Sequence, residues 1–93
     1  MVVGIVRIEL HVPAARSLKD KRHVVRGLKD RIRERAQAAV AEVDHHDLWQ
    51  RAALGVAVVA TDGAQVRERL QLVRGLVEQA FEAQLTDWQE RIE

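Results

Sequence analysis

Residues 41–51 gather the side chains of this sequence that are best able to do chemistry. The segment carries two adjacent histidines, three acidic residues and one of the two tryptophans, between two apolar runs. Carboxylates and imidazoles are ligands for Zn²⁺ and other transition metals. Adjacent residues of an extended segment point to opposite faces, however, so the consecutive residues 44–47 do not readily surround one ion. We therefore expect neither a bound metal nor a cofactor here.

Two other interpretations of this loop remain open. In the first, Asp44 and Asp47 accept hydrogen bonds from backbone donors of a turn, and His45 is hydrogen-bonded locally. In the second, the loop contacts a partner, because Trp and Arg dominate binding hot spots. The tryptophan is expected to be partly buried, with its ring against the end of a sheet and one edge open. The predicted partner-binding residues are Asp44, His45, Asp47, Trp49 and Arg51.

The residue types needed for covalent catalysis are almost absent. Ser17 is the only serine and is expected to cap a helix, there is no cysteine, and no glycine-rich loop is present to cradle a phosphate. Glu42 and Asp44 are two residues apart and would share one face of a strand, where a carboxylate pair can do acid–base work. Such pairs usually face solvent, so we predict no catalytic residues and no enzymatic activity.

A second candidate site is the basic segment 16–35. It holds nine of the fifteen basic residues and three of the fourteen acidic ones, a net charge of +6, which leaves −5 in the rest of a chain whose total is +1. Lysine and arginine neutralise phosphates and release counterions, so such a segment suits a nucleic-acid backbone. The alternative is a solvated helix face balanced by acids elsewhere. The predicted nucleic-acid-binding residues are Arg16, Lys19, Lys21, Arg22, Arg26, Lys29 and Arg33.

Base recognition by aromatic stacking on the sheet is not expected. Sheets that read RNA in this way carry aromatic residues on their central strands. The segments 2–12 and 52–60, which read as the central strands, contain none. The partner is therefore expected to be an RNA or a ribosomal particle that is contacted through shape and phosphate, with low sequence specificity.

Two amphipathic helices and four strands are needed to position these groups. Residues 2–12 alternate between two faces and read as a strand, which Pro13 closes. Ser17 then opens a helix, with Asp20 as the second member of a capping box. The expected buried stripe of this helix is Leu18, Val25, Leu28, Ile32 and Ala36.

The second half of the chain repeats this plan. Residues 38–44 read as a strand, and the nearly continuous apolar run 52–60 reads as a central strand covered on both sides. A second helix follows the turn at 61–63, and a final strand covers 85–92. The expected buried stripe of the second helix is Val66, Leu70, Val73, Val77, Ala80 and Phe81.

The order βαββαβ predicts one domain, 1–93, of the ferredoxin-like α+β class. This fold has a four-stranded antiparallel sheet with two helices on one face. The other face would then be open, and apolar positions alternating with charged ones suit a homodimer in which Arg7 of one copy meets Glu9 or Glu42 of the other. The expected open face carries Val3, Ile5, Arg7, Glu9, His11, Val40, Glu42 and Asp44.

Several motifs resemble the YlxP-like family, also called domain of unknown function 503. They are the segments 17–22 (SLKDKR), 41–45 (AEVDH) and 47–51 (DLWQR), together with Val3-Gly4-Ile5 and the run 54–59. The resemblance covers essentially the whole chain. It implies a small bacterial protein with a ferredoxin-like fold, whose genes commonly lie among those for translation initiation and ribosome maturation factors. It implies no catalytic residues.

The start of the chain does not read as a targeting segment. Residues 1–12 lack the basic start and the unbroken apolar run of a signal peptide. No stretch approaches the roughly 18 consecutive apolar residues of a membrane span. We therefore expect a cytoplasmic protein that does not contact a membrane.

Overall fold

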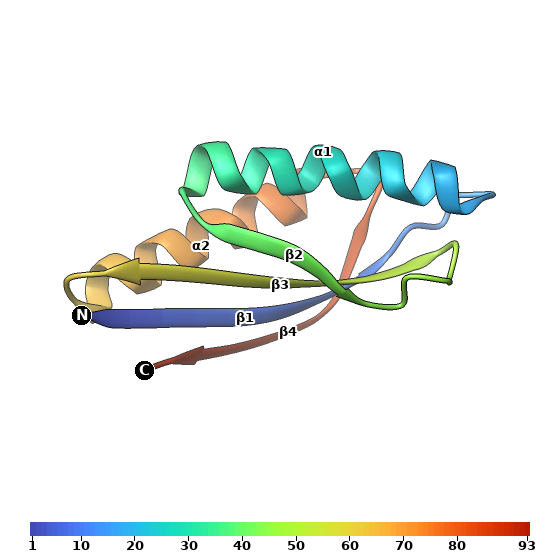
Figure 1. Ribbon diagram of the computed structural model, residues 1–93. Coiled ribbons are helices and arrows are strands. Elements are labelled where there is room, and N and C mark those ends of the chain that lie inside the picture. Colours follow the sequence, from blue (N-terminus) through green and yellow to red (C-terminus); the bar gives the residue numbers. More distant parts are fainter.

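The computed structural model describes all residues, 1–93, and contains the six predicted elements in the predicted order. The strands form one antiparallel sheet in the order β2-β3-β1-β4, and both helices cover the same face of it (Figure 1). The ferredoxin-like α+β fold is therefore confirmed. The elements are β1 (Val2–His11), α1 (Leu18–Ala36), β2 (Ala39–Asp44), β3 (Arg51–Ala60), α2 (Gly63–Gln79) and β4 (Gln84–Ile92).

Strand β1 lies in the centre of the sheet and divides the two faces as its alternation predicts. Val6, Ile8 and Leu10 are buried beneath the helices. Arg7 and Glu9 point to the opposite face, which no helix covers. The same strand thus supplies the core on one side and charged groups on the other.

Both helices begin at the caps that the sequence suggests. The Ser17 hydroxyl accepts a hydrogen bond from the Asp20 amide at 3.0 Å, and the Asp62 carboxylate accepts one from the Gln65 amide at 2.9 Å. Helix α2 ends at Gln79, earlier than predicted. Phe81 consequently lies beyond the helix and is 91% exposed, so its assignment to the buried stripe is wrong. Neither helix is both long and apolar enough to cross a membrane.

Gly4 allows α2 to pack closely on β1. A Cβ atom at this position would lie 2.3 Å from Val66 Cγ1 and 3.0 Å from Leu70 Cδ1. No side chain fits there unless the helix moves away from the strand. The glycine of the Val3-Gly4-Ile5 motif therefore sets the distance between these two layers.

Strand β2 has the opposite orientation to the one predicted. Val40 is opposite the buried Val56 and is itself buried, and Glu42 lies on the same, helix-covered face. A β-bulge between Glu42 and Asp44 then inserts one residue, which turns Asp44 to the open face opposite Ala53. The prediction that Val40 and Glu42 belong to the open face is wrong, and that for Asp44 is correct.

Strand β3 is central but is covered by helices on one face only. Leu54, Val56 and Val58 enter the core, whereas Val59 is 54% exposed on the open face. Ala53 also faces that side, yet it is fully buried. In the register of the sheet Ala53 lies between Glu9 of β1 and Asp44 of β2, two charged residues of the open face.

Candidate functional site

The cations of α1 form one continuous row along its solvent face. They are separated by three and four residues in alternation, so they lie on one side of the helix, along about 21 Å of its length. Four of them form no ion pair within the chain, and Arg33 is paired with Asp30 at 3.5 Å. We call this row the basic stripe; it consists of Lys19, Arg22, Arg26, Lys29 and Arg33.

Arg16 and Arg33 lie near the two ends of the basic stripe. Arg16 is exposed just before α1, and its guanidinium has no acidic partner, because Asp20 accepts only its backbone amide. Arg33 donates to the Val40 carbonyl at 3.1 Å but keeps 48% of its side chain exposed. Both residues thus remain accessible to a phosphate.

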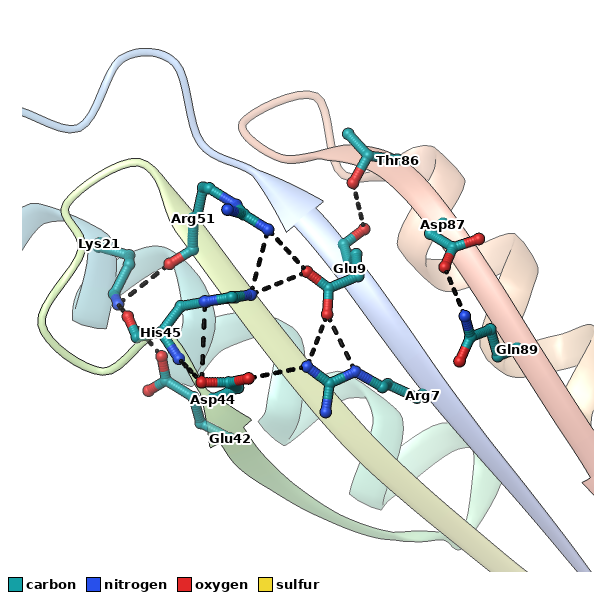
Figure 2. A network of polar contacts seen from close by, with 10 residues as sticks. All are labelled: Arg7, Glu9, Lys21, Glu42, Asp44, His45, Arg51, Thr86, Asp87 and Gln89. Carbon is teal, nitrogen blue, oxygen red and sulfur yellow. Dashed lines mark hydrogen bonds and ion pairs between the residues drawn. The ribbon is translucent and has the colours of Figure 1, made fainter.

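Lys21 differs from the other predicted phosphate-binding residues because it is completely buried. Its ammonium donates to three backbone carbonyls, those of His45 (2.7 Å), His46 (3.4 Å) and Arg51 (3.1 Å). It also lies 3.2 Å from Glu42 Oε2. The expectation that Lys21 contacts phosphate is wrong. Position 21 is on the buried face of α1, one turn before Val25. From there the Lys21 side chain reaches the β2–β3 loop and binds its carbonyls (Figure 2).

The open face carries a group of interlocked charges, which we call the charged cluster: Arg7, Glu9, Asp44, His45 and Arg51 (Figure 2). Arg7 Nη2 lies 2.9 Å from Glu9 Oε2 and 3.0 Å from Asp44 Oδ2. Arg51 Nη2 lies 3.3 Å from Glu9 Oε1. The two arginines and the two carboxylates balance one another, so the cluster presents no excess charge to a partner.

These contacts favour the charged form of each group that they shift. The His45 backbone amide and then the Arg7 guanidinium hold the pKa of Asp44 below its ordinary value. Burial by itself raises the pKa of Glu9, but the hydrogen bonds from His45 and Arg7 outweigh it, so this pKa is also lowered. Hydrogen bonds to Asp44 and Glu9 raise the pKa of Arg7. Arg7, Glu9 and Asp44 are therefore charged near neutral pH and form ion pairs there.

Both ring nitrogens of His45 face acidic groups of its own chain. Nε2 lies 3.0 Å from Glu9 Oε1, and Nδ1 lies 3.8 Å from Asp44 Oδ1. The backbone at His45 is left-handed, with φ of 62°, which reverses the chain after the bulge. No three histidine, aspartate or glutamate side chains converge as a metal-binding set. Asp44 accepts a hydrogen bond from the His45 amide, as the turn interpretation predicts. The His45 ring instead contacts Glu9 of β1, and Asp47 accepts no backbone hydrogen bond, so these two parts of that interpretation are wrong.

The loop residues beyond His45 are free of the charged cluster. Asp47 is exposed, and Trp49 has 55% of its surface exposed, in agreement with the predicted partial burial. Of the five predicted partner-binding residues, Asp44, His45 and Arg51 lie together in the charged cluster. The other two, Asp47 and Trp49, are exposed and lie outside it.

Sequence reasoning missed two residues that organise this region. Glu9 is the hub of the charged cluster and accepts from three side chains. Arg7 and Glu9 are two residues apart on β1, so the strand period already placed both on one face. The sequence did not indicate which residues of other elements they would contact. Lys21 lies three residues after Leu18 and four before Val25, in phase with the buried stripe, and that phase was a usable signal for its burial.

This geometry defines a ferredoxin-like α+β protein with a basic helix on one side and an open sheet face on the other. The chain belongs to the family described as "Protein of unknown function (DUF503)", whose model matches residues 3–90. The "Uncharacterized protein YlxP" of Bacillus subtilis (strain 168) is 28% identical to it over 85 residues, which cover 91% of this chain and 92% of the relative. The family resemblance seen in the sequence motifs is thereby confirmed.

Proposed function

We propose that this chain is a non-enzymatic accessory of translation or ribosome assembly that binds RNA or a ribosomal particle through the basic stripe. The single observation that supports RNA binding is the row of five cations on the solvent face of α1, four of them without an acidic partner. Cations left unpaired on one face of a helix are free to replace the counterions of a phosphate backbone. The link to translation is carried by the family resemblance alone.

The same proposal makes phosphate contact, rather than base reading, the main source of affinity. The open sheet face of β1 and β3 carries aliphatic and charged side chains but no aromatic ring. The acids and the histidine of the charged cluster are paired with groups of their own chain, which leaves no free acid–base pair for chemistry. A binding protein fits these features better than an enzyme does.

The affinity for RNA is expected to fall steeply as salt rises. If all five cations of the stripe contact phosphates of a single strand, the logarithm of the association constant should fall with the logarithm of the salt concentration at a slope of about −3.5. Fluorescence anisotropy with a labelled RNA between about 50 and 200 mM salt measures this slope. Absence of association with RNA and with ribosomal particles at the lowest salt would rule out the proposal.

A second candidate is a homodimer formed through the open sheet face, favoured by an apolar hollow of about 680 Å³ on that face. Its floor includes Ile5, Ala41 and Gly55. The side chains of Arg33 and His46 donate to carbonyls of the edge strand β2, which favours a face-to-face contact over strand addition. Glu42 cannot take part in such a contact, because it lies on the helix-covered face and is paired with Lys21. A contact of Arg7 with Glu9 of a second copy would have to replace or extend the pairs that both residues form within the chain.

The dimer has a direct test. The double change Ile5→Glu with Ala41→Glu places two carboxylates on the floor of the hollow and should give folded monomers, whereas the wild type should run as a dimer at micromolar concentration. Light scattering measures the mass, and circular dichroism checks the fold. A wild-type protein that stays monomeric at high concentration excludes this candidate.

A further inference from the structure

A half-exposed tryptophan lies where the basic stripe begins. Trp49 borders a hollow of about 520 Å³ together with Pro13, Ala15, Arg16 and Gln50. These residues come from two connections, β1–α1 and β2–β3, which meet beside the start of α1 (Figure 1). The hollow thus joins an aromatic ring to a cation with no acidic partner.

Hydrogen bonds on both sides of Trp49 hold it in place. The Gln50 side-chain amide donates to the carbonyls of Pro13 (3.0 Å) and Ala15 (3.1 Å), and the Val12 amide donates to the Gln50 carbonyl at 2.9 Å. Lys21 fixes the rest of the loop from the other side. A ring carried on a fixed backbone has only its two side-chain torsions left to lose when a flat ligand stacks on it.

The other aromatic residues are not equivalent to Trp49. Trp88 is half-buried, with its indole N–H bonded to Glu90 and the Arg74 guanidinium 5.2 Å above its ring. Phe81 is 91% exposed and is not held by neighbours in the same way. Trp49 alone combines a fixed backbone, an open side and a position beside Arg16 at the start of the basic stripe.

We propose that Trp49 and Arg16 hold an unpaired nucleotide of the bound RNA, with the base stacked on the indole and the adjacent phosphate contacted by the guanidinium. Aromatic rings stack on unstacked bases, and they do so with little preference among bases. A base within a duplex is already stacked and is not available. The inference rests on the proposed function and deepens it, because it names the RNA class as one with a single-stranded segment beside the stretch that α1 contacts.

The test uses the intrinsic fluorescence of Trp49. The chain has two tryptophans, so a Trp88→Phe background leaves Trp49 as the only one. Titration with a short single-stranded oligoadenylate should quench its emission, and a blunt RNA duplex of equal length should not. Trp49→Ala should weaken oligoadenylate binding by about 5- to 150-fold and leave duplex binding unchanged. Trp49→Phe should restore most of the affinity, and Phe81→Ala, as the control, should have no effect.

The outcomes separate this inference from the proposed function. If oligoadenylate binds and the Trp49 emission does not change, or if Trp49→Ala weakens single-stranded and duplex binding equally, the stacking site is excluded while binding through the basic stripe stands. If the oligoadenylate does not bind at low salt, the stacking site is excluded. If ribosomal particles and both RNAs also fail to bind, the proposed function is excluded as well.

Discussion

Lys21→Met is expected to lower the free energy of unfolding by about 3–5 kcal/mol. Methionine keeps the length and the apolar stem of the side chain but removes the charge. Three carbonyls of the β2–β3 loop and a carboxylate oxygen of Glu42 would then lose the ammonium group that they share. Leaving such buried groups unpaired is among the most destabilising changes known in proteins. Thermal unfolding measures the effect, and the melting temperature should fall by on the order of 20 °C.

Lys19→Met is the matched control, because the same change is made two residues away on the same helix. Lys19 is exposed and forms no ion pair, so this variant should unfold within about 0.5 kcal/mol of the wild type. Hydrogen exchange of residues 45–50 should rise in Lys21→Met only. If the two variants were equally stable, Lys21 would not be what holds the loop.

Reversing the charge of the three residues in the middle of the basic stripe should nearly abolish RNA binding. The triple variant Arg22→Glu, Arg26→Glu and Lys29→Glu converts three attractive groups into repulsive ones and changes the net charge from +1 to −5. None of the three side chains makes a hydrogen bond or an ion pair within the chain, so the fold should persist. We expect affinity for RNA to fall by about 100-fold or more and the salt slope to become shallower by about two.

A second triple variant separates a local site from general electrostatics. Arg35→Glu, Arg67→Glu and Arg91→Glu change the net charge equally, at exposed positions outside the stripe. This protein should retain most of the affinity of the wild type in the same anisotropy measurement. Equal losses in both triple variants would show that overall charge, rather than the stripe, governs binding.

The faces of β1 and α1 could be predicted from sequence because each has a regular period. The alternation of Val6, Ile8 and Leu10 with Arg7 and Glu9 is the pattern of a strand covered on one side. The apolar spacing of α1 predicted the burial of Val25, Leu28, Ile32 and Ala36 correctly, whereas Leu18 is only partly buried. Ser17 with Asp20 marked the start of the helix. These are local properties, in which a residue and its near neighbours carry the whole signal.

Strand β2 shows where local pattern fails. It is short and carries only alanine and valine as apolar residues, so either alternating set of its side chains could be taken as the buried one. Pairing with β3 places Val40 on the helix-covered face. The bulge then puts Asp44 on the open face, although it is two residues after Glu42, which is on the helix-covered face. A one-residue insertion exchanges the two faces of a strand, and no property of residues 39–44 by themselves specified it.

The sequence by itself determined the fold class, the position of the basic helix and the polar character of the β2–β3 loop. Hydrophobic period, caps and charge distribution along the chain are enough for these features. Only the tertiary structure decided that Lys21 belongs to the loop and not to the basic stripe, and that Glu9 joins Arg7, His45 and Arg51. These contacts link residues that are distant in sequence. They depend on the register of β1 with β3 and on the bulge in β2, because these set which side chains meet.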